Sequence, residues 1–224
     1  MSPDADSKPL RDQVHEKLLS LLTNGEYGPG EHLSERLLSE RLGVSRGPVR
    51  EAMRLLERDG WVSLHAGRGA FVRTLTDAEV DEIFEARVLV ESASARLAAI
   101  RVPSAGCPEL FAIVEESNEL LAAGGHMGAL SELTIRFHHE VSELSGNRFL
   151  IEFSHRIRTM SLLVVAQLAP WIAPEAWTEH AQIAQAIKVG DAVRAEELMR
   201  SHLAWGRRVY RTRPAGPDRR AEGA

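Results

Sequence analysis

Residues 44–60, VSRGPVREAMRLLERDG, constrain the fold more strongly than any other stretch of this 224-residue chain. Ser45 is suited to cap a helix N-terminus, and Gly60 is suited to end the helix. The apolar residues recur at helical spacing and define one buried face: Val49, Met53 and Leu56. The arginines step by four residues along another face: Arg46, Arg50, Arg54 and Arg58. The stretch therefore predicts an amphipathic helix with a cationic stripe on its exposed side.

The sequence on either side of this helix predicts the fold around it. Residues 34–42 read as a short helix that a tight turn joins to residues 44–60, which is the spacing of a helix-turn-helix. Residues 61–64 and 70–73 read as two short strands around a glycine-rich tip that carries Arg68. A helix-turn-helix followed by such a hairpin is a winged helix, whose second helix enters the major groove of DNA. Arg68 would then reach the DNA beside that groove.

Two motifs in this region resemble a known family. Residues 29–36 read PGEHLSER and residues 42–53 read LGVSRGPVREAM, and both are similar to the N-terminal domain of the GntR family of bacterial transcription regulators. The resemblance covers about residues 10–74 and implies binding to double-stranded DNA. The residues expected to contact DNA are Arg36, Ser45, Arg46, Gly47 and Arg50 in the helix-turn-helix, and Gly67 and Arg68 in the wing.

Arg46 is the residue expected to read a base. An arginine can donate two hydrogen bonds to O6 and N7 of guanine in the major groove, whereas a serine at a helix N-terminus, such as Ser45, suits a phosphate. Arg54 and Arg58 lie further along the helix and are expected to meet the DNA backbone or solvent. The alternative for the whole stripe is a solvated helix face, which is the usual role of charged residues on helices.

The composition is that of a globular protein, with 44% hydrophobic and 26% charged residues and length enough for two modest domains. The formal charge of −5 does not argue against nucleic acid, because residues 1–75 carry eleven basic and eleven acidic side chains. The single cysteine, Cys107, is expected to be a buried apolar residue. No apolar stretch is long enough to span a bilayer and residues 1–8 lack signal-peptide features, so we expect a cytoplasmic protein without membrane contact.

Only helical signals follow the winged-helix region. Residues 76–79, TDAE, form a capping-box pattern that opens a helix running to about residue 101. Glycines, prolines and an aspartate cap mark five further helices, at about residues 108–123, 127–145, 148–168, 175–189 and 192–211. The predicted fold is therefore mostly α, with an N-terminal winged helix-turn-helix followed by an all-α bundle of six helices.

These patterns divide the chain into four parts. Residues 1–9 are expected to be a flexible N-terminus, and residues 10–74 a DNA-binding domain. Residues 76–210 are expected to form an effector-binding and dimerisation domain. Residues 211–224 are rich in arginine, proline and glycine, which predicts a disordered tail.

Three of the nine histidines lie on three different predicted helices of the bundle: His138, His180 and His202. Side chains on facing helices build the metal sites of helix bundles. Three neutral imidazoles on rigid helices would hold a divalent ion such as Zn²⁺ or Ni²⁺ and leave positions open for water or a carboxylate. The alternative is that they are surface histidines or core histidines that each satisfy one hydrogen bond.

The helical region resembles the FCD ligand-binding domain over about residues 76–210. The segments that carry the resemblance are EARVLVE at 85–91, FH at 137–138, SGN at 145–147, EH at 179–180 and MRSHL at 199–203. This resemblance implies the FadR subfamily, and six helices rather than seven imply its VanR-type subgroup. It also implies a metal held by the three histidines together with an Asp or Asn four residues before the first of them. This chain has Thr134 at that position, and a hydroxyl is a poorer ligand than a carboxylate.

The effector that the resemblance implies is a small organic acid. Arg87, on the first helix of the bundle, is the cation we expect to pair with its carboxylate. The alternative for Arg87 is an ion pair with Glu91, four residues later on the same helix.

Together these features predict a homodimeric, sequence-specific repressor that binds an inverted-repeat operator and responds to a small organic acid. A dimer is expected because one short helix contacts too few base pairs for useful specificity. One alternative is a metal-free regulator whose bundle is only a dimerisation scaffold. A remote alternative is a metal-dependent hydrolase with Glu140 or Glu179 as its base, but that function leaves the winged helix unexplained.

Overall fold

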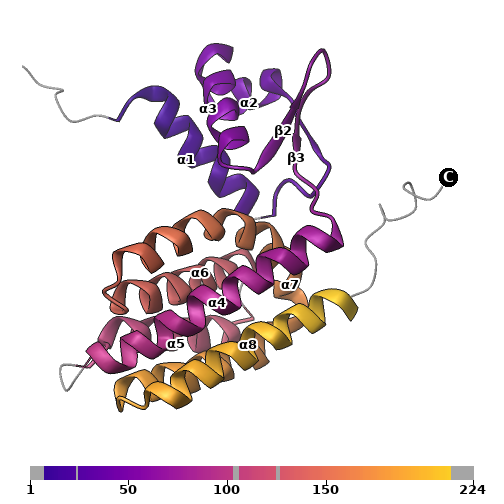
Figure 1. Ribbon diagram of the computed structural model, residues 1–224. Coiled ribbons are helices and arrows are strands. Elements are labelled where there is room, and N and C mark those ends of the chain that lie inside the picture. Colours follow the sequence, from indigo (N-terminus) through magenta and orange to yellow (C-terminus); the bar gives the residue numbers. More distant parts are fainter. Residues whose placement is uncertain (1–7, 24, 103–105, 125–126, 213–224) are drawn as a thin grey trace, which may run out of the picture.

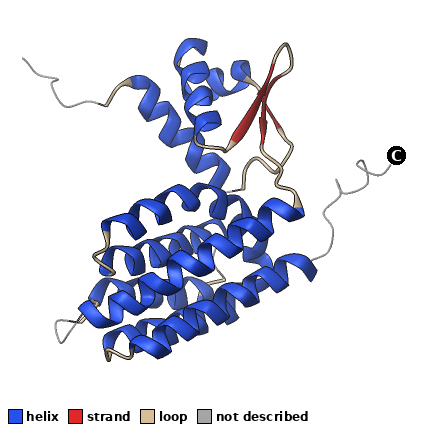
Figure 2. Cartoon of the chain, viewed as in Figure 1, coloured by secondary structure: helices blue, strands red, loops and turns tan. Residues whose placement is uncertain are grey.

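The computed structural model describes residues 8–23, 25–102, 106–124 and 127–212. Figure 1 shows a smaller N-terminal part, made of helices and a twisted hairpin, that rests on a layered bundle of helices. Figure 2 shows that the strands of the described residues all lie in the smaller part. The predicted mostly α fold is therefore confirmed. Most of the two ends that we expected to be flexible, residues 1–7 and 213–224, lies outside the described residues. Residues 211 and 212, which we placed in the disordered tail, are instead helical.

The N-terminal part contains these elements: α1 Leu10–Thr23, β1 His32–Leu33, α2 Glu35–Leu42, α3 Arg46–Arg58, β2 Val62–His65 and β3 Gly69–Val72. The strands form an antiparallel sheet in the order β1-β3-β2. β2 and β3 are the expected wing, with Val62 opposite Val72. The sequence patterns do not predict β1, because two residues are too few to show an alternation. Its pairing of Leu33 with Ala70 fastens the wing to the rest of the fold.

α2 and α3 form the predicted helix-turn-helix. Ser34 Oγ accepts a hydrogen bond from the Leu37 amide at 3.4 Å and caps α2, and Gly43 ends α2 with a φ of 66°. Glycine adopts this left-handed conformation without strain. α3 buries four side chains almost completely: Val49, Ala52, Met53 and Leu56. Because this face is held in the core, the opposite face of α3 is fixed toward solvent.

The start of α3 differs in one respect from the prediction. Ser45 has the extended backbone of an N-cap residue, with a ψ of 163°, but its side chain makes no capping hydrogen bond. The prediction that its hydroxyl accepts a first-turn amide is therefore wrong. The hydroxyl is exposed at the positive end of the helix dipole, where an anion is favoured.

The larger part is an all-α bundle with these elements: α4 Asp77–Arg101, α5 Pro108–Ala122, α6 Met127–Leu144, α7 Arg148–Lys188 and α8 Ala192–Thr212. The two helices predicted at 148–168 and 175–189 are one continuous helix of 41 residues, so the described bundle has five helices rather than six. The expected break lay before Pro170. A proline removes one amide donor and kinks a helix but need not end it, and the described backbone stays helical there.

Two hydrophobic clusters organise the interior. One lies inside the bundle and includes Phe137 and, as predicted, the buried Cys107. The other contains residues of both parts, among them Trp61 from the N-terminal part and Phe84 and Tyr210 from the bundle. The winged helix therefore packs on the bundle through a shared core, which gives changes in the bundle a physical route to α3.

The junction between the two parts is a capping box at the start of α4. Thr76 Oγ1 accepts from the Glu79 amide at 3.2 Å, and Glu79 Oε2 accepts from the Thr76 amide at 2.8 Å. Arg73, at the end of the wing, forms an ion pair with Glu79. The Thr76 amide, followed by the Thr76 hydroxyl and Arg73, holds the pKa of Glu79 below its ordinary value. These contacts give the wing a defined attachment to α4.

Thr76→Ala is expected to lower the free energy of unfolding by about 1 kcal/mol, because a first-turn amide of α4 loses its acceptor. Ser45→Ala is the matched control, since Ser45 holds the same position on α3 without a capping hydrogen bond. It is expected to change the free energy of unfolding by less than about 0.5 kcal/mol. Urea unfolding followed by circular dichroism measures both variants. Equal losses in the two variants would contradict this difference between the caps.

Candidate functional site

The exposed face of α3 carries the predicted arginines, and ion pairs distinguish them. Three of the four are paired at 2.8, 2.9 and 3.5 Å: Arg50 with Glu35, Arg54 with Glu51 and Arg58 with Asp59. Arg46, the first residue of α3, is exposed beside Ser45 and Gly47, and it forms no ion pair with any described residue. Arg46 is therefore the cation of this face that can contact DNA without giving up a carboxylate.

Arg50 and Arg36 are held by neighbouring carboxylates. Arg50 donates from Nε and Nη2 to the two oxygens of Glu35 on α2, at 3.0 and 2.8 Å. The hydrogen bond from Arg50 is the main reason that the pKa of Glu35 lies below its ordinary value. Arg36 donates to Glu40 at 2.8 Å within α2. Exposed pairs of this kind contribute little in water, so a phosphate could replace either carboxylate at small cost.

The tip of the wing presents the remaining two predicted residues. Gly67 is exposed between β2 and β3 and has a φ of 72°. An added Cβ there would meet no atom within 4 Å, so the backbone conformation rather than space favours glycine. Arg68 is exposed, with its guanidinium carbon 5.6 Å from the centre of the Phe71 ring. The wing therefore ends in a defined turn that carries one cation.

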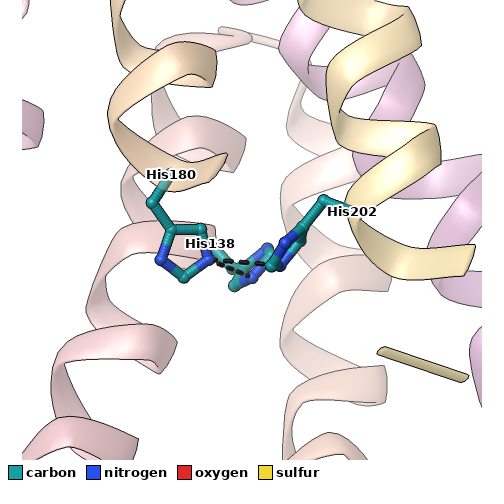
Figure 3. A group of neighbouring side chains, drawn as sticks. All are labelled: His138, His180 and His202. Atoms are coloured by element: carbon teal, nitrogen blue, oxygen red, sulfur yellow. Dashed lines mark hydrogen bonds between the residues drawn. The ribbon is translucent and has the colours of Figure 1, made fainter. Parts of the chain in front are cut away.

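The three predicted histidines meet inside the bundle, and we call this group the histidine centre (Figure 3). His138 on α6, His180 on α7 and His202 on α8 direct their side chains toward one another. His180 Nε2 lies 3.3 Å from Nε2 of His138 and 3.2 Å from Nε2 of His202. His180 is fully buried, and the side chains of His202 and His138 are 8% and 10% exposed. Residues far apart in the sequence thus bring three ring nitrogens to one point.

Two carboxylates lie against the outer nitrogens of the histidine centre. His202 Nδ1 is hydrogen-bonded to Glu179 Oε2 at 2.7 Å. His138 Nδ1 lies 2.6 Å from Glu91 Oε2, an ion-pair distance without hydrogen-bond alignment. A carboxylate at Nδ1 favours the proton on that nitrogen, which leaves the Nε2 lone pair facing inward. The sequence patterns link Glu91 only to Arg87 and suggest Glu179 only as the base of a hydrolase, so they miss both of these roles.

Burial keeps two rings of the histidine centre neutral, those of His138 and His180. His180 stacks on Phe137 at 4.3 Å between ring centres and meets the Trp177 ring edge-on at 4.6 Å. Burial lowers the pKa of His180 well below its ordinary value and lowers the pKa of His138 to about 4. Neutral imidazole is the form that ligates metals. Burial alone would raise the pKa of Glu91, but Arg87 and then His138 hold it well below the ordinary value.

Thr134 and Arg87 lie beside the histidine centre in different roles. Thr134 is one turn before His138 on α6, and its hydroxyl donates to the Leu130 carbonyl at 3.0 Å. Arg87, which is 4% exposed, donates from Nε to Glu91 Oε1 at 2.6 Å. The ion pair considered as the alternative for Arg87 is therefore present, but it is buried. Glu91 joins Arg87 to His138 in one buried chain of polar groups.

A winged helix-turn-helix packed on an all-α bundle is the architecture of a two-part DNA-binding regulator. Residues 10–72 match the family described as "Bacterial regulatory proteins, gntR family", and residues 82–204 match the FCD domain. The chain belongs to the GntR family of transcription regulators and carries an FCD domain.

The relatives of the chain have names of the same kind. The HTH-type transcriptional regulator YdhC of Bacillus subtilis is 34% identical over 67% of this chain and 63% of its own length, so the chain spans less than two thirds of that protein. The Uxu operon regulator of Haemophilus influenzae is 30% identical over 81% of this chain and 74% of its own length. The HTH-type transcriptional repressor GlaR of Escherichia coli is 26% identical over 81% of this chain and 87% of its own length.

Two solved structures share the fold. E. coli McbR/YncC superposes with a TM-score of 0.79 at 21% identity, over 92% of this chain and 98% of that one. A putative GntR regulator from Rhodococcus sp. RHA1 superposes with a TM-score of 0.81 at 24% identity, over 91% and 99%. At these identities the similarity concerns the fold alone.

The matched families and relatives are transcription regulators rather than enzymes, so the hydrolase alternative is not supported. Its candidate base Glu179 is hydrogen-bonded to His202. None of the described helices combines the length and the apolar composition needed to cross a lipid bilayer.

Proposed function

We propose that the chain is a homodimeric, sequence-specific repressor whose operator affinity changes when a small carboxylate binds in the helical domain. Residues 10–74 act as the DNA-binding domain and residues 76–210 as the effector-binding and dimerisation domain of a cytoplasmic member of the FadR subfamily; the VanR-type subgroup is not proposed, because the described bundle has five helices rather than six. The observation that carries the proposal is the histidine centre. Three imidazoles converge in the part of the molecule that shares a core with the winged helix.

Two copies of α3 are needed to read an operator. One short helix contacts few base pairs, whereas a two-fold dimer reads both halves of an inverted repeat. In each copy Arg46 donates to a guanine, while Ser45, Gly47, Arg36 and Arg50 meet phosphates and Gly67 and Arg68 position the wing. The name of the related repressor GlaR supports repression as the direction of control. Sedimentation of a monomer at micromolar concentration would contradict the dimer.

Two nitrogen–nitrogen distances within the histidine centre, both from His180 Nε2, fit a tetrahedral ion. Two nitrogens bound to Zn²⁺ at about 2.05 Å and at the tetrahedral angle lie about 3.3 Å apart. The separations from His180 Nε2 to the other two Nε2 atoms are 3.3 and 3.2 Å. His138, His180 and His202 would therefore hold Zn²⁺ or Ni²⁺. Such an ion would supply open coordination positions for a carboxylate effector.

Arg87 supplies a route from the effector to the DNA-binding domain. It is joined to the histidine centre through Glu91 and lies on α4, which begins at the junction with the wing. A carboxylate that reached Arg87 would compete with Glu91 for the guanidinium and alter the contacts of α4. Differential ligand affinity for two arrangements of α4 is what coupling to operator binding requires.

Thr134→Asp is expected to tighten Zn²⁺ binding at the histidine centre by about tenfold or more, because a carboxylate is a stronger ligand than a hydroxyl that donates to its own helix. Competition with a chromophoric chelator measures the affinity. Thr134→Asn is the control for shape, and its gain is expected to be smaller than that of the carboxylate. An aspartate variant no tighter than wild type would show that position 134 cannot reach the ion.

A second candidate is a metal-free regulator whose bundle serves only dimerisation. Thr134 favours it, because the strong fourth ligand is missing. Metal analysis of the purified protein beside His180→Ala distinguishes the two candidates. Release of operator DNA by members of a panel of small carboxylic acids, in wild type but not in His180→Ala, would support the metal-linked effector. A metal-free wild type that ignores the whole panel would support the scaffold.

A further inference from the structure

We propose that the chain has a second metal site, at its surface, formed by His139, Glu143 and His155. His139 and Glu143 are one turn apart on α6, and His155 lies on α7, so the three side chains bridge two helices. The potential ligand atoms of all three lie within 4.8 Å of one another. This surface site shares no residue with the histidine centre.

The side chains of the surface site are close enough to converge on one ion. His139 Nε2 lies 3.8 Å from Glu143 Oε1, and the rings of His139 and His155 are edge to face with 4.9 Å between their centres. Ligands of one tetrahedral ion lie about 3.3 Å apart, so the group must contract by roughly an ångström. His139 and Glu143 are 34% and 45% exposed, and His155 is exposed. Small rotations can therefore close the site without disturbing the core.

The donor set selects the class of metal. Two imidazoles and one carboxylate suit Zn²⁺, Ni²⁺ or Cu²⁺, whereas Mg²⁺ and Ca²⁺ prefer oxygen ligands alone. Water would complete the coordination because the site is open to solvent. Metal sites on helices combine ligands one turn apart on one helix with a ligand from a facing helix. Residues 139 and 143 are the one-turn pair, and residue 155 is the ligand from the facing helix.

The surface site and the histidine centre differ in access to solvent. His138 and His139 are adjacent on α6, but successive residues of a helix point about 100° apart, so α6 serves both groups. An ion in the surface site would exchange quickly with a chelator, and one in the histidine centre slowly. The surface ion would also link α6 to the half of α7 whose Leu163 and Val164 join the core shared with the winged helix. Metal supply would thereby stabilise the packing of the DNA-binding part.

The test is a Zn²⁺ titration of the full chain after removal of metal, followed by release to a chromophoric chelator. Wild type is expected to take up one ion per chain more than His155→Ala, and the rapidly released ion is the one that His155→Ala lacks. Glu143→Gln should lower the affinity for that ion by about tenfold or more. His65→Ala, which removes another exposed histidine, should keep it.

The outcome is independent of the histidine centre. His180→Ala should retain the rapidly released ion, while His155→Ala should retain the slowly released one. Equal uptake and equal release by wild type and His155→Ala would overturn the surface site and leave the proposal for the histidine centre untouched. Loss of the rapidly released ion in His65→Ala as well as in His155→Ala would also overturn the surface site. Metal binding would then depend on the number of exposed histidines rather than on this group.

Discussion

The His180→Ala variant is expected to lose the slowly exchanging metal ion that we propose for the histidine centre. His180 Nε2 lies within 3.3 Å of both other imidazole nitrogens, so it is the ligand that connects the set. Its removal leaves two histidines on an ion that already lacks a strong fourth ligand. Loss of an outer-shell partner alone weakens metal binding by about 10- to 100-fold, so loss of a direct ligand should cost at least about 100-fold.

The same variant is expected to be less stable for two reasons. A bound ion stabilises the folded state by about 2.7 kcal/mol when its free concentration is 100 times the dissociation constant. Truncating a ring that stacks on Phe137 also leaves a cavity in the bundle core, and core truncations cost about 2–5 kcal/mol. Thermal unfolding with and without chelator separates these effects, because chelation of the slowly exchanging ion should lower the midpoint of wild type alone.

The exposed histidine variant His65→Ala is the control for this experiment and should behave as wild type. A His180→Ala protein that held the slowly exchanging ion with unchanged affinity would exclude the histidine centre as the metal site.

Arg46→Ala is expected to abolish selective operator binding while leaving the fold intact. Arg46 is exposed and has no ion-pair partner among the described residues, so its removal breaks no ion pair of α3 among those residues. A two-bond contact to guanine is worth about 1–3 kcal/mol of discrimination, and a dimer makes the contact in both half-sites. Operator affinity should therefore fall by about 30-fold or more. Titration of fluorescent operator DNA measures the loss.

Arg58→Ala is the matched control, because it removes the same charge from the opposite end of α3. Its guanidinium lies 3.5 Å from Asp59, and we expect contact with solvent or the DNA backbone. If it contacts the DNA backbone, its loss should weaken binding to all duplexes alike and reduce the dependence of that binding on salt. The opposite pattern, with selectivity lost in Arg58→Ala and kept in Arg46→Ala, would mean that α3 is oriented differently on DNA.

Much of the fold is predictable because local patterns determine it. The spacing of Val49, Met53 and Leu56 gives a recognition helix within two residues of α3, and the capping box at Thr76 gives the first residue of α4. The missed strand β1 has only two residues and exists through pairing with β3. The continuous α7 was missed because a proline removes one amide donor from a helix but need not end it.

The histidine centre was predictable only in part. Spacing and resemblance selected His138, His180 and His202, whose meeting requires α6, α7 and α8 to converge. The carboxylates next to His138 and His202 were not predictable, because each comes from a different helix. Glu91 reaches His138 from α4, and Glu179 reaches His202 from α7. Contacts between elements leave no periodic signal in a sequence.

Selection from a library of random DNA duplexes tests most directly whether the chain is a sequence-specific regulator that reads DNA through α3. The purified full chain is incubated with the library at moderate salt, bound duplexes are amplified, and Arg46→Ala is carried in parallel. We predict enrichment of a short inverted repeat that is bound by a dimer and is not enriched by Arg46→Ala. Enrichment of no sequence above the salt-sensitive background would contradict the account.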